Sequence, residues 1–211
     1  MQLFWQGYSS IRIESKNGDM VSTLVTDPFE NESSIRFPRT VEPDLLVLSH
    51  EDRKRFNLAG VSGKPFIVSR PGEYEAKGVF VHGIQDGSVS DQQLVHRITT
   101  EGMAIAFLGS MKRKPTNEEL EKLENIDILV LPVGGGDVMD AEAAADIVQT
   151  IEPRIVVPVH YQIAGLKAKL DGVDAFCKHM GACQREESNR LKIQKKDLPA
   201  DNILIAVLER A

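Results

Sequence analysis

Short apolar runs, separated by Gly, Pro and Asp residues, dominate the N-terminal half of the chain. Residues 11–13 alternate between apolar and polar side chains, which is typical of a strand with one buried face. The other runs have the length of strands and are bounded by turn-forming residues. The pattern predicts strands at residues 11–13, 23–26, 44–48, 65–68, 79–81 and 102–108.

Helical patterns appear in the C-terminal half, where capping residues precede apolar positions at helical spacing. Thr116 and Glu119 fit a capping box at the start of a short helix. Asp140 fits the N-cap position of an Ala-rich helix over residues 141–151. A third helix is predicted over residues 173–180.

Further apolar runs at residues 128–131, 155–159 and 203–208 lie between and after these helices and predict buried strands. An alternation of strands and helices favours an α/β fold with a mixed sheet. Because the chain has no repeat, no low-complexity tract and no Ser/Gly-rich linker, we expect a single domain over residues 1–211.

Composition narrows the partners and the compartment. The formal net charge of −6 argues against nucleic acid and anionic membranes, because both select basic surfaces. No window approaches the roughly 18 apolar residues that a membrane span requires, and the first residues lack the basic segment of a signal peptide. We therefore expect a cytoplasmic protein that binds neither nucleic acid nor a membrane.

The two cysteines, Cys177 and Cys183, fall at the end of the helix predicted over residues 173–180. Because cysteines are so few, we expect two unpaired thiols in a reducing compartment. The sequence contains no Cys-x-x-Cys, so it does not predict a zinc site built from thiolates.

Polar residues that directly follow apolar strands are the candidate site residues, because loops at strand ends project side chains from a rigid base. These candidates are Asp27, the loop 49–52, the pair 109–110 and His160. The remaining histidines are expected to be structural: His82 in a strand pattern, His96 in a polar stretch and His179 on a helix. No Gly-x-Ser-x-Gly elbow is present, so the sequence does not predict a serine hydrolase.

Several of these strand-end segments, taken together, resemble the short bacterial branch of metallo-β-lactamase-fold hydrolases, close to the ascorbate-6-phosphate lactonase-like group. The resemblance rests on their order and spacing over nearly the whole chain. The matching segments are residues 5–9, 25–29, 43–50, 71–75, 127–135, 152–161 and 166–173. The resemblance implies an α/β fold of the αββα sandwich type, in which two mixed β-sheets pack face to face and are flanked by helices on both outer sides.

The resemblance also implies a dinuclear metal site, usually zinc, at one edge of the sandwich. Members of the family build it from a His-x-His-x-Asp-His loop, a later His, an Asp after a strand and a final His. The metals activate a bridging water, which attacks an ester, a lactone or a phosphodiester.

This sequence keeps few of those metal ligands. His50 matches the first His of the loop and His160 matches the final His. The departures are Asp52 for the second His, Lys54 for the Asp, Arg55 for the last His of the loop, Ser110 for the bridging Asp and Tyr8 for an early His.

Lys54 and Arg55 place positive charge where the family binds cations. A unit charge ~4 Å from a divalent ion costs roughly 8 kcal/mol at an effective dielectric constant of ~20. We hypothesise that Lys54 or Arg55 instead replaces the charge of the metal and pairs with Asp27 or Asp52.

The sequence therefore predicts a metallo-β-lactamase-fold protein that has lost metal-dependent hydrolysis, needs no cofactor and binds a small molecule or a protein partner. A homo-oligomer is compatible with this interpretation, and Asp27, His50 and His160 are its candidate catalytic residues. The alternative is a hydrolase of a small lactone, ester or phosphoester. There His50, Asp52 and His160 bind one Zn or other divalent ion, or His50 and His160 act as acid and base without metal. A purely structural or assembly role is the third interpretation.

Overall fold

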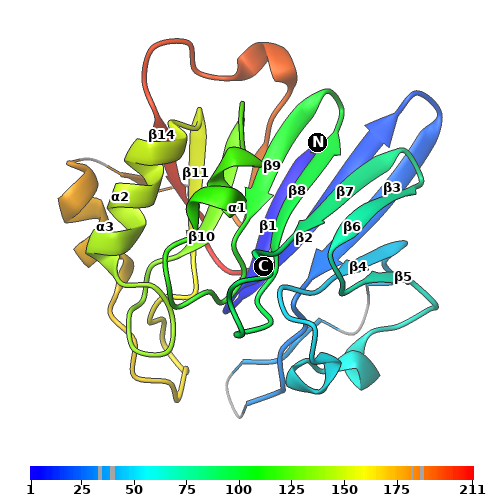
Figure 1. The fold of residues 1–211 in the computed structure, drawn as a ribbon, viewed down its shortest axis with the longest axis horizontal. Coiled ribbons are helices and arrows are strands. Elements are labelled where there is room, and N and C mark those ends of the chain that lie inside the picture. Colours follow the sequence, from blue (N-terminus) through cyan, green and yellow to red (C-terminus); the bar gives the residue numbers. More distant parts are fainter. Residues whose placement is uncertain (33–34, 39–40, 182, 186–187) are drawn as a thin grey trace.

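Two mixed β-sheets face each other across a large apolar core (Figure 1). The computed structural model describes residues 1–32, 35–38, 41–181, 183–185 and 188–211. The N-terminal strands form most of one sheet, and the middle and C-terminal strands form the other. This arrangement confirms the α/β class and the two mixed sheets that the resemblance implied.

The first sheet has the strand order β13-β1-β2-β3-β4-β5 in the described residues. Its strands are β1 (Gln2–Gly7), β2 (Ser10–Asn17), β3 (Met20–Thr26), β4 (Leu45–Val47), β5 (Phe66–Val68) and β13 (Arg190–Lys192). Pairing is antiparallel from β13 to β3 and parallel from β3 to β5. Because β13 pairs with β1, this sheet brings a segment near the C-terminus beside the N-terminal strand.

The second sheet has the strand order β12-β14-β11-β10-β9-β8-β7-β6 in the same part of the chain. Its strands are β6 (Gly72–Ala76), β7 (Val79–Ile84), β8 (Val95–Thr100), β9 (Met103–Phe107), β10 (Ile128–Pro132), β11 (Ile155–Val159), β12 (Gln184–Arg185) and β14 (Leu204–Val207). Strands β12 to β9 run parallel, and β9 to β6 are antiparallel. The parallel strands β10 and β11 are buried along their whole length, as both faces are covered.

Alternation along the strands divides the apolar residues between two cores. Leu45 and Val47 of β4 point into the core between the sheets, whereas Leu46 and Leu48 belong to a smaller cluster. The smaller cluster also contains Phe29 and other residues of the connections that follow β3 and β4. These connections therefore cover the outer face of the first sheet.

Three α-helices occur in the described residues: α1 (Asn117–Glu121), α2 (Ala141–Ile151) and α3 (Val173–Met180). Figure 1 shows them beside β10, β11 and β14, so they flank the second sheet. The first sheet is covered by irregular segments with short 3-10 turns at Arg53–Arg55 and Leu58–Gly60. A third 3-10 turn spans Lys195–Asp197. None of the helices in the described chain has the length and apolar character needed to cross a membrane.

All strands and helices predicted from the pattern are present, but five strands were not predicted. These are β1, β6, β8, β12 and β13. The assignment of His96 to a polar stretch is wrong, since His96 lies in β8 and is fully buried. His82 in β7 and His179 in α3 lie in the predicted kinds of element.

The prediction of two unpaired thiols is wrong, because Cys177 and Cys183 form a disulfide. Gly181, with φ of 82°, ends α3 and turns the chain back toward the helix. The two Cα atoms are consequently 5.4 Å apart, within the range that a disulfide spans. The two cysteines therefore do not support the predicted reducing compartment.

Candidate functional site

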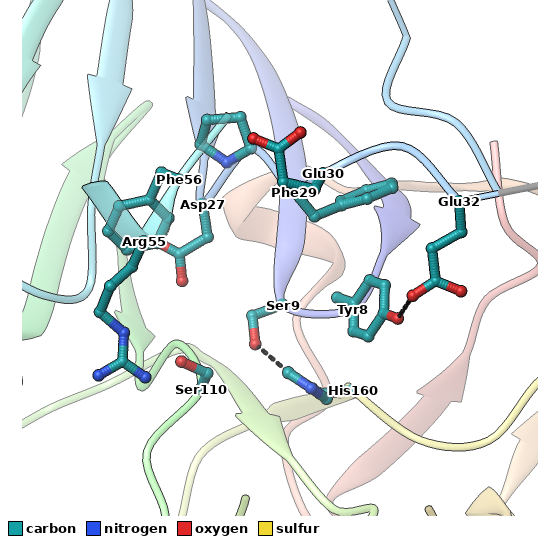
Figure 2. Close-up of a pocket in the computed structure, with 11 residues that line it drawn as sticks. Tyr8, Ser9, Asp27, Phe29, Glu30, Glu32, Arg55, Phe56, Ser110 and His160 are labelled. Carbon is teal, nitrogen blue, oxygen red and sulfur yellow. Dashed lines mark hydrogen bonds between the residues drawn. The ribbon is translucent and has the colours of Figure 1, made fainter. Parts of the chain in front are cut away.

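A small pocket opens where the connections that follow β1, β3, β9 and β11 meet at one edge of the sandwich (Figure 2). Its volume is about 240 Å³. It is lined by Tyr8, Ser9, Asp27, Pro28, Phe29, Glu30, Glu32, Arg55, Phe56, Ser110 and His160. Figure 2 shows Arg55 and Phe56 on one side, Tyr8 and Glu32 on the other, and Ser9 with His160 between them. The pocket therefore offers a cation, a carboxylate and an imidazole to a small ligand.

Three residues that line the pocket adopt a left-handed backbone conformation although none is glycine. The φ angles are 47° for Tyr8, 39° for Asp27 and 54° for His160. Such a conformation costs of order 1–3 kcal/mol and concentrates at functional sites. It is maintained here by hydrogen bonds between the loops, since His160 N–H donates to Tyr8 O at 2.9 Å and Asp27 N–H donates to Val47 O at 3.1 Å. The clustering of this strain marks the pocket as the candidate site.

His160 presents a neutral imidazole to the pocket. Its Nδ1 lies 2.7 Å from Ser9 Oγ in a hydrogen bond. Burial lowers the pKa of His160 to about 4, and the nearby Asp137 opposes this shift. At neutral pH the ring is therefore uncharged and retains a lone pair that can accept a proton.

Asp27 is buried beside the pocket, and Ser49 satisfies its carboxylate. The Ser49 N–H donates to Oδ1 at 2.8 Å and the Ser49 hydroxyl donates to Oδ2 at 2.6 Å. Burial raises the pKa of Asp27 to about 7, against the opposing effects of Ser49 and the Arg55 charge. Asp27 is thus only partly ionised at neutral pH.

Arg55 supplies the positive charge of the pocket. Its charge lowers the pKa of both Asp27 and His50, so the guanidinium lies near both groups. Within the part of the chain that the structure describes, neither Arg55 nor Lys54 forms an ion pair with a carboxylate. The hypothesis of charge replacement therefore fails for Lys54, which is exposed. For Arg55 it stays a prediction, since the Arg55 charge lies near Asp27 without a direct ion pair.

His50 and Asp52 do not line the pocket. His50 is buried, and its Nδ1 accepts a hydrogen bond from the Asp52 N–H at 2.9 Å. The Asp52 carboxylate accepts a hydrogen bond from the Lys54 N–H at 3.1 Å and caps the turn at Arg53–Arg55. Asp27, His160 and Arg55 are brought together in the pocket, whereas His50, Asp52 and Lys54 serve the geometry of the loop beside it.

The described residues do not fit the metal centre that the resemblance implies. In the ranges given above, no three His, Cys, Asp or Glu side chains form a group that could hold a metal ion. A ligating histidine normally donates from the ring nitrogen that faces away from the metal. His50 instead accepts with Nδ1, so its Nε2 carries the proton of the neutral ring and has no lone pair to offer. The set His50, Asp52 and His160 is therefore not assembled as one metal site.

Two pocket residues that carry hydroxyl groups, Ser9 and Tyr8, were not predicted as functional. Tyr8 donates a hydrogen bond to Glu32, and burial and this carboxylate raise the pKa of Tyr8 well above its usual range. The signal for both was their position in a tight turn directly after a strand. That strand, β1, was not predicted, and the resemblance named Tyr8 only as the residue that replaces an early His of the family.

Two mixed sheets with a pocket at the strand ends define the class of metallo-β-lactamase-fold proteins. A family model described as a β-lactamase superfamily domain matches residues 2–160. The chain therefore belongs to the metallo-β-lactamase superfamily.

Individual relatives carry the names of hydrolases. A UPF0173 metal-dependent hydrolase of Methanosarcina mazei is 24% identical over 196 residues, which cover 76% of this chain and 83% of the relative. A UPF0173 protein of Pyrococcus furiosus is 24% identical over 190 residues, which again cover 76% of this chain and 83% of the relative. A structure from Thermotoga maritima, described as a candidate Zn-dependent hydrolase of this superfamily, is 26% identical with a TM-score of 0.80, and the match covers 99% of this chain and 98% of that one.

Proposed function

We propose that the protein hydrolyses a small ester or lactone in the pocket around His160, with His160 as the general base. The observation that carries this proposal is the neutral, half-buried imidazole of His160, which lines a strained pocket together with the Arg55 cation. A general base within hydrogen-bonding distance of the attacking group typically contributes a factor of about 10² to 10⁴ to the rate. The hydrolase names of the relatives support the same class of reaction.

The other pocket residues have complementary tasks. Arg55 offers a positive charge to the oxygen that becomes negative as the carbonyl is attacked. Asp27, whose pKa is about 7, can hold a proton at neutral pH. The volume of about 240 Å³ restricts the substrate to a small molecule.

This proposal differs from the metal-dependent alternative because the donor atoms do not fit a metal. His50 accepts from the Asp52 N–H with Nδ1, so its Nε2 carries the proton of the neutral ring, and in the described residues no three His, Cys, Asp or Glu side chains are grouped as metal ligands. We therefore assign the proton transfers to the side chains of the chain itself. A cytoplasmic location and a small-molecule partner remain proposals of the same kind.

The expected activity is tested with p-nitrophenyl acetate and γ-butyrolactone as substrates. The His160→Asn variant should lower kcat/KM by at least about 100-fold, because it removes the base while Asn tolerates the left-handed backbone. The wild-type rate should fall as the pH drops through about 4, where His160 becomes protonated. His179→Asn, an exposed change on α3, is the matched control and should retain activity.

A binding module without turnover is the second candidate, favoured by the lack of an assembled metal group in the described residues. The same assay separates the two functions. No hydrolysis above background for either substrate, together with binding of an ester or lactone that His160→Asn leaves unchanged, would support the binding module and contradict the hydrolase.

A further inference from the structure

Ser9 occupies a sharp turn between β1 and β2 that directs its hydroxyl to His160 (Figure 2). The residues before it, Gly7 and Tyr8, have φ of 121° and 47°, so the chain reverses tightly at this point. Ser9 Oγ and His160 Nδ1 are 2.7 Å apart. A nucleophile hydrogen-bonded to its base is the arrangement that activates a serine.

The neighbouring Ser10 shows what a purely structural serine looks like in this turn. Its hydroxyl donates to Thr26 O at 2.6 Å and lies 3.2 Å from Gln6 Oε1, and the residue is fully buried. Ser9 is also buried, with 2% of its surface exposed, but it lines the pocket and its hydroxyl is hydrogen-bonded to an imidazole.

In the described residues, none of the other hydroxyl groups around the pocket is hydrogen-bonded to an imidazole. Ser49 donates its proton to Asp27 and does not line the pocket. Ser110 lines the pocket, but none of the described imidazoles is hydrogen-bonded to it. The Tyr8 hydroxyl donates to Glu32, and that carboxylate keeps it protonated.

We propose that Ser9 is the nucleophile of this hydrolase and forms an acyl-enzyme with the substrate. This inference rests on the proposed function but goes beyond it, since a base alone could equally activate a water. A serine nucleophile was not predicted from the sequence, because the turn around Ser9 has no Gly-x-Ser-x-Gly pattern.

The reaction proceeds in two balanced halves. In the first, the Ser9 hydroxyl proton moves to His160 Nδ1, Ser9 Oγ bonds to the carbonyl carbon, and the bond from that carbon to the alkoxide breaks. The alkoxide takes the proton from His160 and leaves as an alcohol, or stays tethered if the substrate is a lactone. In the second, His160 takes a proton from water, the hydroxide attacks the acyl carbon, and Ser9 Oγ leaves and regains the proton from His160.

Covalent labelling of the full-length protein tests this directly. An alkyl fluorophosphonate should form one adduct per chain, and tandem mass spectrometry of the N-terminal tryptic peptide should place it on Ser9. His160→Asn should slow labelling by at least about 100-fold. Ser110→Ala, which removes the other serine hydroxyl of the pocket, should leave the adduct on Ser9.

A variant of Ser9 itself, Ser9→Cys, gives a second test that does not depend on the fluorophosphonate. In Ser9→Cys the new thiol is the sole free one, because Cys177 and Cys183 are bonded to each other. Iodoacetamide should alkylate it at least about 10-fold faster than it alkylates the same variant carrying His160→Asn.

The outcomes separate this inference from the proposed function. Ester hydrolysis without any adduct on Ser9, or with an adduct on another serine, would overturn the nucleophile assignment and leave the hydrolase intact. Equal alkylation rates with and without His160 would also overturn it. The absence of both hydrolysis and labelling would overturn the inference and the hydrolase together.

Discussion

At the scale of single residues, two effects act on the pKa of Asp27 in opposite directions. It is buried, and it accepts two hydrogen bonds from Ser49 that favour the charged form. The burial dominates, so the pKa rises to about 7. A carboxyl group in this state can release and take up a proton near neutral pH.

Asp27 should make the stability of the protein depend on pH. Because its folded pKa of about 7 lies above the ordinary value of 3.8, the folded state binds an extra proton between these two values. The stabilisation of the folded state by this proton is complete below about pH 4 and is lost as the pH rises through 7. Relative to Asp27→Asn, the wild-type free energy of unfolding should fall by up to about 4 kcal/mol over this range. Urea denaturation of both proteins at pH 4.5, 6 and 8 measures it, and a constant difference would contradict the raised pKa.

His96 presents the opposite case, a buried imidazole without partners. Neither ring nitrogen has a hydrogen bond, and burial with the nearby His82 charge lowers the pKa of His96 to about 3. His96→Leu should therefore raise the free energy of unfolding by about 1–3 kcal/mol. Because the pKa of His96 is depressed in the folded state, the wild-type protein loses stability as the pH falls from 6.5 toward 3. The stability gained by His96→Leu should therefore be larger at pH 5 than at pH 8.

Thermal or urea unfolding of His96→Leu at the two pH values checks this expectation. His179→Leu on the exposed face of α3 is the control and should change stability by less than about 0.5 kcal/mol. A loss of stability in His96→Leu would mean that the ring has a partner, such as a buried water.

Sequence position alone identified some of the site residues. Asp27 and His160 follow apolar strands directly, and the structure places both at the pocket. His50 follows a strand in the same way, yet the N–H of Asp52 satisfies its Nδ1 and the residue is buried outside the pocket. Which strand-end residue faces the pocket depends on hydrogen bonds between loops, and the sequence does not encode these as a pattern.

At the scale of elements, local signals predicted the helices well. Thr116 and Glu119 form the capping box, and Asp140 accepts from the Ala143 N–H at the start of α2. These interactions join residues close in sequence, so the sequence reveals them. Strands β1 and β13 pair across most of the chain length, with Leu3 opposite Leu191. No local sequence pattern predicts a pairing between segments so far apart, which explains why neither strand was predicted.

The turn after β9 illustrates how an element depends on one glycine. A Cβ atom added to Gly109 would lie 2.1 Å from Ser49 Cβ and Oγ, and 3.1 Å from Asp27 Oδ2. Gly102 has a similar φ, 71° against 59°, but open space around its Cα. Gly109→Ala should therefore cost about 2 kcal/mol more stability than Gly102→Ala.

Urea denaturation of the two alanine variants provides this comparison. Both glycines have a left-handed backbone, so the cost of placing alanine in that conformation cancels in the difference between the two free energies of unfolding. Gly109→Ala should also displace Ser49 from Asp27 and reduce ester hydrolysis, whereas Gly102→Ala should retain it. Equal losses of stability in the two variants would contradict the close packing of Gly109 on Ser49.

At the scale of the whole molecule, the fold was predictable because its segments occur in a recognisable order over nearly the whole chain. The sandwich forms from apolar strands and does not need a metal to join its sheets, since the core between them is continuous. The outer face of the first sheet differs from the expectation, as irregular segments rather than α-helices cover it in the described residues. The chemistry of the pocket was less predictable from the sequence, because it depends on which side chains the loops bring together.

Dependence of hydrolysis on metal tests the central claim most directly. The claim is that this chain carries out the reaction with His160 and its neighbours, although several of its relatives are named metal-dependent hydrolases. After dialysis against EDTA, the rate of p-nitrophenyl acetate hydrolysis should stay within about twofold of the untreated value, and added zinc should not raise it. Activity that disappears with EDTA and returns with zinc, while His160→Asn abolishes zinc binding, would contradict the account.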